Sequence, residues 1–141
     1  MILVLGIAVL LFAVYEVYLK NPPQNSVADY ASKAGFSGFA LVEAVAIAYA
    51  ESSGDPNAVG DVNLGRSIGL WQINLAAHPE YSEQELYDPQ TNANAAFAIY
   101  QAAGDSFSPW TTFNTGAYSH YLDRATSETQ SADDTGAQDG E

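Results

Sequence analysis

The residue best placed to do chemistry in this sequence is Glu51, a carboxylate that follows the apolar segment 39–50. That segment is apolar on nearly every side apart from Glu43, which predicts a buried helix. Burial and the dipole at a helix C-terminus both penalise the ionised form, so both raise the pKa of Glu51. A carboxyl group still protonated near neutral pH can donate its proton to a leaving oxygen. Considered alone, however, Glu51 is better explained as a surface carboxylate at a fraying helix end.

Four short motifs that occur in order along the chain change that interpretation. They are Glu51-Ser52, Pro56-Asn57-Ala58, Gly69-Leu70-Trp71-Gln72 and Phe113-Asn114-Thr115-Gly116. Together they resemble the motifs of the lytic transglycosylases and goose-type lysozymes, and the resemblance covers roughly residues 36–122. It implies a mainly α, lysozyme-like domain that acts on the glycan strands of bacterial peptidoglycan. It also implies that Glu51 is the catalytic acid and base, and that the reaction uses neither a metal nor a cofactor.

The resemblance implies further residues that bind the sugar. Ser52 would form a hydrogen bond near the site, and Gln72 and Asn114 would contact N-acetyl or hydroxyl groups. Tyr118 falls where such enzymes often place an aromatic side chain that faces the sugar. Trp71 is expected either to stack on a sugar or to fill the core, and the sequence leaves these two roles open.

The sequence also leaves open whether a second carboxylate takes part. The segment 69–74 resembles animal-type lysozymes, in which an Asp two residues before the first Gly is the second carboxylate, but this chain has Ser67 there. A retaining mechanism with two carboxylates therefore lacks its expected nucleophile. Asp61 lies in the loop that precedes Ser67, ten residues after Glu51, and is the nearest substitute. Goose-type enzymes use loop aspartates to position water. A loop Asp more often only forms a turn.

With a single carboxylate, the expected reaction is a substrate-assisted one that forms a 1,6-anhydro muramic acid. The expected function is therefore that of a membrane-anchored lytic transglycosylase. The stretch 108–118 resembles wall-degrading proteins carried by phages, which favours local cell-wall opening by a phage. The alternatives are a hydrolytic lysozyme and a wall-binding virion protein without catalytic activity.

The chain divides into four segments by composition. The first segment is residues 1–20, of which residues 1–19 are apolar apart from Glu16 and, as a helix of about 28 Å, would cross the hydrocarbon core of a bilayer. They predict a single transmembrane anchor, located in a virion membrane or a bacterial envelope, with a cleaved signal peptide as the rival explanation. Residues 21–26 form a Pro-containing linker, 27–124 the folded domain, and 125–141 an acidic tail without large apolar residues. That tail is expected to be disordered or ordered by a protein partner.

Local patterns within the domain predict mostly helices. Helices are expected over 27–34, 39–50, 82–87, from Pro89 to Gly104, and over 116–122, whereas 60–66 predicts a loop or small hairpin. Ser82 with Glu85 has the spacing of a capping box, and Asp88 with Pro89 that of an N-cap followed by the first helical residue. No series of strands is expected.

Composition excludes some functions. The formal net charge is −13, with four basic and seventeen acidic residues, so nucleic acid is not an expected partner. The acidity fits a halophilic source or simply a soluble, lysine-poor domain. Cysteine is missing, and the two histidines, His78 and His120, share no metal-binding motif and are expected to be structural or on the surface.

Overall fold

The computed structural model describes residues 9–10, 12–13 and 25–136. The expected anchor over 1–20 and linker over 21–26 therefore lie almost entirely outside the described residues. Among the helices that the structure does describe, none is long and apolar enough to cross a membrane.

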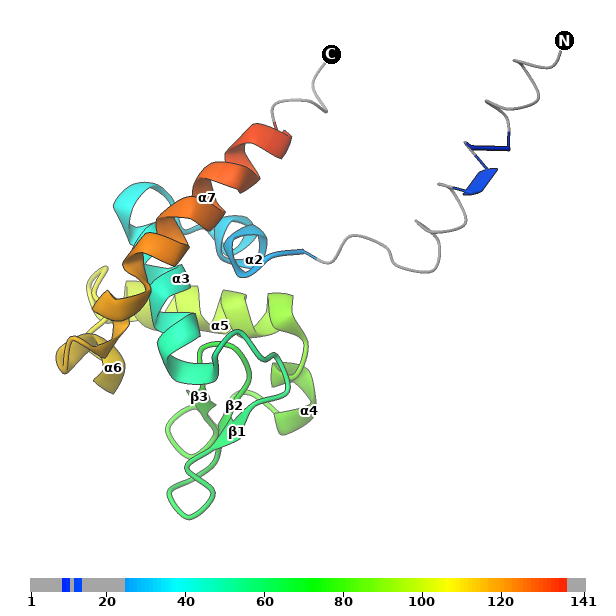
Figure 1. The fold of residues 1–141 in the computed structure, drawn as a ribbon. Coiled ribbons are helices and arrows are strands. Elements are labelled where there is room, and N and C mark those ends of the chain that lie inside the picture. The colour runs from blue at the N-terminus through cyan, green and yellow to red at the C-terminus, as the bar shows by residue number, and fades with distance from the viewer. Residues whose placement is uncertain (1–8, 11, 14–24, 137–141) are drawn as a thin grey trace, which may run out of the picture.

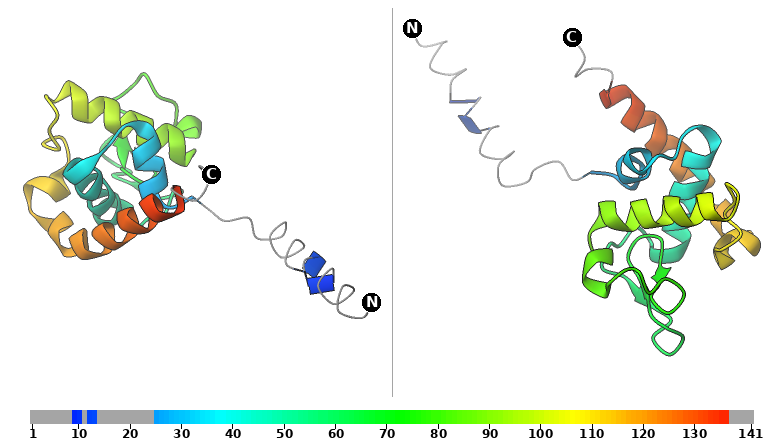
Figure 2. Two further views of the ribbon diagram at one scale, coloured as in Figure 1. Left: turned by 90° about the horizontal axis from the view of Figure 1, so that it is seen from above. Right: turned by 180° about the vertical axis from the view of Figure 1, so that it is seen from behind.

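The central element of the domain is the helix α3 (Gly38–Ser52), in which every residue from Ala44 to Tyr49 is buried. It corresponds to the buried helix expected over 39–50. The helix α2 (Val27–Ala34) precedes it and begins with a capping box between Ser26 and Asp29. Figures 1 and 2 show α3 lying beside α2 and the later helix α7, and the three helices contact one another. The C-terminal end of α3 carries Glu51.

A small antiparallel sheet follows the end of α3 (Figure 1). Its strands are β1 (Val59–Gly60), β2 (Ser67–Ile68) and β3 (Ile73–Asn74), in the order β1-β2-β3. Val59 pairs with Ile68, and Ile68 pairs with Ile73. The loop between β1 and β2 spans 61–66, where a loop or small hairpin was expected, and the two strands pair on either side of it; the third strand, β3, was not expected.

Two capped helices come next, and their caps match the sequence patterns. The helix α4 (Glu83–Leu86) begins with a capping box between Ser82 and Glu85. The helix α5 (Pro89–Ala102) begins with Asp88, whose carboxylate accepts a hydrogen bond from the N–H of Thr91. Since α5 packs against α2 and buries Asn92, Ala93, Ala95 and Ala96, it forms a second wall of the core.

The last elements are α6 (Thr111–Asn114), the 3-10 helix η1 (Ala117–Tyr121) and α7 (Leu122–Gly136). The short helix α6 was not expected from the sequence. The aromatic side chains of Phe36, Tyr100, Phe107 and Trp110 pack together beside it and join it to the core.

The acidic segment from Ala125 differs from the expected disordered tail, because the structure continues it as helix α7 to Gly136. The expected domain end at residue 124 therefore lies inside a helix. Ala125 is fully buried, and the carboxylate of Glu128 accepts hydrogen bonds from the N–H of Ala28 and the hydroxyl of Tyr49. Polar contacts to α2 and α3 thus order a segment whose apolar content alone predicted no stable structure.

Candidate active site

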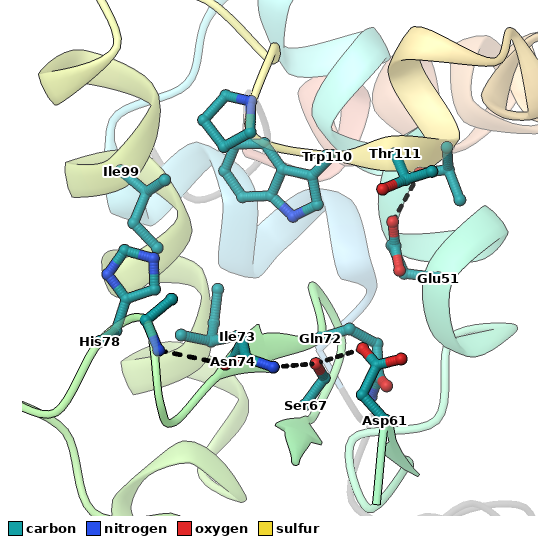
Figure 3. A pocket seen from close by; sticks show the side chains of 13 residues that line it. Glu51, Asp61, Ser67, Gln72, Ile73, Asn74, His78, Ile99, Trp110 and Thr111 are labelled. Carbon is teal, nitrogen blue, oxygen red and sulfur yellow. Dashed lines mark hydrogen bonds between the residues drawn. The ribbon is translucent and has the colours of Figure 1, made fainter. Parts of the chain in front are cut away.

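The site is a pocket of about 380 Å³ between the end of α3, the small sheet and α6. Glu51 lies on one side, and Asp61, Ser67 and Gln72 lie across from it (Figure 3). The complete set of lining residues is Glu51, Asp61, Ser67, Gln72, Ile73, Asn74, Ala77, His78, Ile99, Pro109, Trp110, Thr111 and Thr112. The pocket therefore combines two carboxylates with amides and hydroxyls, which can donate and accept hydrogen bonds and transfer a proton.

Glu51 occupies the last turn of α3. Its Oε1 accepts a hydrogen bond of 2.7 Å from the Oγ1 hydroxyl of Thr112. Burial raises the pKa of Glu51 above its ordinary value, and the negative charge of Asp61 raises it further, whereas the hydroxyl and backbone N–H of Thr112 act to lower it. The net shift is upward, so Glu51 has the electrostatic character of a proton donor.

Gln72 is held in the pocket by its own amide nitrogen. Its Nε2 donates to the carbonyl oxygens of Ala58 (3.1 Å) and Gly69 (3.0 Å). The side-chain oxygen lies against Gly60, where a Cβ would displace it from its present position. Because both of these bonds use the nitrogen, the amide oxygen is the side-chain atom of Gln72 that remains to accept a hydrogen bond.

Asp61 is anchored by a chain of polar side chains. Its Oδ2 accepts a hydrogen bond of 2.7 Å from Ser67 Oγ, which in turn accepts one of 3.2 Å from Asn74 Nδ2 (Figure 3). The backbone carbonyl of Asp61 also accepts from the N–H groups of Leu64 and Arg66, which closes the loop. Ser67, where the sequence lacks the expected aspartate, therefore binds the carboxylate that the loop supplies.

A buried network connects the walls of the pocket. Asn92 is fully buried, its Oδ1 accepts from the N–H of Trp71, and its Nδ2 donates to the carbonyls of Ile68 and Leu86. It lies so close to Gly69 (φ 78°) that a side chain there would clash with it. The indole of Trp71 donates to Ala44 on α3. These contacts fix the turn that carries Gln72, between β2 and β3, relative to the helix that carries Glu51.

The structure brings three of the expected site residues together: Glu51, Gln72 and Asp61. Ser52 is buried and donates its hydroxyl to the carbonyl of Ala48, so it bonds within its own helix next to the pocket rather than lining it. Trp71 has no exposed surface, so of its two expected roles it takes the one in the core and cannot stack on a sugar.

The other two expected residues lie beyond the pocket wall. Asn114 is exposed and donates its amide to the carbonyl of Ser108 at 2.8 Å, which stabilises the turn that precedes α6. Tyr118 packs on the ring of Phe113, with 5.0 Å between ring centroids. Neither belongs to the lining set, so contact with a sugar would require a ligand that extends past α6.

Sequence reasoning missed Thr112, whose hydroxyl contacts Glu51. The sequence offered only a weak signal for Thr112, because nothing about two adjacent threonines before Phe113 indicates contact with a residue as distant in the chain as Glu51. His78 also lines the pocket, with its Nδ1 3.4 Å from Glu80 Oε1. Within the part of the chain that the structure describes, no group of three or more His, Asp or Glu side chains is arranged to hold a metal ion.

Comparison with known protein families gives a match. A family model described as a lysozyme-like domain matches residues 28–112 of the chain. This range includes Glu51, Asp61 and Gln72 and ends at Thr112. No curated protein and no solved structure matches the chain.

Proposed function

The chain belongs to the lysozyme-like domain family, and we propose that it is a peptidoglycan lytic transglycosylase with Glu51 as its acid and base. Membership of this family supports a peptidoglycan-degrading enzyme in general. The observation that carries the finer proposal is the position of Glu51: a largely buried carboxyl group of raised pKa, at the end of a buried helix, facing a polar pocket. A glycosidic oxygen needs such a donor in order to leave.

The proposed reaction uses the substrate's own groups. Protonated Glu51 donates its proton to the oxygen that links N-acetylmuramic acid to N-acetylglucosamine, and the C1–O bond breaks. The N-acetyl carbonyl of the muramoyl residue stabilises the positive charge that develops at C1. Glu51, now ionised, removes the proton from the C6 hydroxyl as that oxygen bonds to C1. The products are a 1,6-anhydro end and a free N-acetylglucosamine hydroxyl, and Glu51 is again protonated.

Hydrolysis is the second candidate, and the position of Asp61 favours it. Its carboxylate lines the same pocket as Glu51 and is oriented by Ser67 at 2.7 Å. Such a carboxylate can take a proton from a water molecule while Glu51 protonates the leaving oxygen. The product would then be a reducing sugar end rather than an anhydro end.

We also propose a membrane-anchored setting, with residues 1–20 as a single span, and local wall opening by a phage as the biological role. The apolar composition of residues 1–19 and the resemblance of 108–118 to phage-carried domains support these two points. Flotation with lipid vesicles tests the anchor: the full chain should float, and a chain that begins at Asn25 should remain at the bottom of the gradient.

The decisive experiment is mass spectrometry of the muropeptides that the full chain, kept in detergent, releases from purified peptidoglycan. We expect 1,6-anhydro ends that disappear when Glu51→Gln replaces the wild type. Reducing ends would identify a lysozyme instead. If the folded wild-type chain releases nothing but still sediments with the wall, the chain is a wall-binding protein.

A further inference from the structure

The hydroxyl of Thr112 is the side-chain donor that Glu51 contacts in the pocket. The Oγ1–Oε1 distance is 2.7 Å, and the two residues come from distant parts of the chain. A carboxyl group has two oxygens, and this bond occupies only Oε1. The contact therefore makes the two oxygens of Glu51 unequal.

The position of Thr112 is itself fixed by the core. It lies in the first turn of α6, two residues after the N-cap Trp110, which is 5% exposed. The indole N–H of Trp110 donates to the carbonyl of Trp71 at 2.9 Å, and the carbonyl of Trp110 accepts from the N–H of Phe113. Thr112 thus reaches Glu51 from a rigid support rather than from a mobile loop.

The direction of this hydrogen bond has a chemical consequence. In the protonated acid, one oxygen is a carbonyl that accepts, and the other bears the proton that it donates. Because the Thr112 hydroxyl donates to Oε1, Oε1 is the carbonyl oxygen and the proton resides on Oε2. Once that proton is transferred, the same bond becomes charge-assisted and therefore stronger, which stabilises the carboxylate that proton donation produces.

We propose that Thr112 is the positioning residue of the catalytic acid: it holds Oε1 of Glu51 so that Oε2 presents the proton to the substrate oxygen. This inference rests on the proposed function of Glu51 as the acid. In this role Thr112 does not contact the sugar. It affects the reaction only by orienting Glu51.

The experiment compares Thr112→Val, which keeps the shape and loses the hydroxyl, with Thr112→Ser, which keeps the hydroxyl. The rate of cleavage of solubilised glycan strands is measured against pH, with kcat and KM determined separately. For Thr112→Val we expect kcat to fall about tenfold with little change in KM, because a hydrogen bond to a charged group is lost. The alkaline limb of kcat should also move to higher pH, since Thr112 acts to lower the pKa of Glu51.

Thr112→Ser should restore both the rate and the position of the alkaline limb. Thr115→Val, in the exposed C-cap of the same helix, is the matched control and should behave as the wild type. The proposal is overturned if Thr112→Val keeps the wild-type rate and pH profile. It is overturned equally if Thr112→Ser loses as much activity as Thr112→Val at an unchanged pH profile, because packing would then explain the loss.

A second measurement does not depend on turnover. Carbon-13 NMR titration of the Glu51 carboxyl in the full chain should give a higher pKa in Thr112→Val, or in Thr112→Ala where the valine variant does not fold, than in the wild type. An unchanged titration curve would overturn the proposal. If instead the wild type cleaves no glycan while Glu51 still responds to Thr112, the proposed function fails and the coupling of these two residues stands.

Discussion

At the scale of single residues, Glu51 is destabilising when it is ionised, because its carboxylate is largely buried. We expect Glu51→Gln to abolish cleavage and yet to raise the unfolding temperature at pH 7 by roughly 2–5 °C. Because folding raises the pKa of Glu51, its carboxyl group stabilises the folded state at pH values below the pKa that it has in the unfolded chain. That stabilisation is lost as the pH rises through the pKa of the folded state. The advantage of glutamine should therefore vanish near pH 4. Thermal unfolding at both pH values tests this, with Asp123→Asn as the exposed control, and a variant less stable than the wild type at pH 7 would contradict it.

Asp61 acts on Glu51 through its charge, which raises the pKa of Glu51. Removing that charge in Asp61→Asn should move the alkaline limb of kcat to lower pH, while 1,6-anhydro products persist. The readout is product analysis by mass spectrometry across a pH series. Asp55→Asn is the control, because Asp55 also accepts a backbone hydrogen bond in a loop but lies outside the pocket. A folded Asp61→Asn that releases no product would make Asp61 the second carboxylate of a hydrolase.

The residues that the sequence identified are those carried by compact motifs. Glu51 and Gln72 stand in short patterns whose spacing is readable along the chain, and the structure brings both to one pocket. Thr112 is 61 positions from Glu51, and their contact exists only because α6 folds back onto α3. The sequence also could not assign Trp71 to the core. An indole after Gly-Leu can either stack on a sugar or fill the core, and only its burial in the structure decides between the two.

At the scale of elements, α7 is held to the domain by Glu128, whose carboxylate accepts from the N–H of Ala28 and the hydroxyl of Tyr49. Burial and Glu128 raise the pKa of Tyr49 to about 12, so Tyr49 remains a neutral donor at physiological pH. We expect Glu128→Ala to lower the free energy of unfolding by about 2 kcal/mol, because two donors lose their acceptor. Urea denaturation measures this.

The controls for that prediction lie at the same position and on the same helix. Glu128→Gln keeps one acceptor oxygen and should cost less than Glu128→Ala, and the exposed Asp123→Asn should cost little. If Glu128→Ala is as stable as the wild type, the two hydrogen bonds of Glu128 do not hold α7 to the domain.

The elements predicted correctly are those with local signals. The helices α2, α4 and α5 begin at capping patterns that involve residues only a few positions apart, and α3 forms from a long apolar segment. The helices α6 and α7 lack such signals. The helix α7 carries few apolar side chains, and its contacts reach back to the first helix of the domain, so composition alone predicted a disordered tail.

At the scale of the whole molecule, the net charge of −13 repels the proposed substrate, because peptidoglycan also carries negatively charged carboxylates on its peptide stems. Like charges slow the encounter of an enzyme with its substrate, and dissolved salt screens that repulsion over about 10 Å at 0.1 M. We therefore expect cleavage at low substrate concentration to speed up severalfold between about 0.01 and 0.15 M salt, whereas a lysozyme of high positive charge would slow down.

The measurement is the initial rate of cleavage at fixed pH over that range of sodium chloride, first with intact peptidoglycan and then with glycan strands stripped of their peptides. The stripped strands lose the carboxylates of the peptide stems but keep the single lactyl carboxylate that each cut frees on a muramoyl residue, so their cleavage should depend less on salt. An equal response for both substrates would mean that salt acts on the protein itself, for example by stabilising an acidic fold against its own repulsion. That result would favour the halophilic origin that the composition also allows, and thermal unfolding across the same salt series would then show a matching rise.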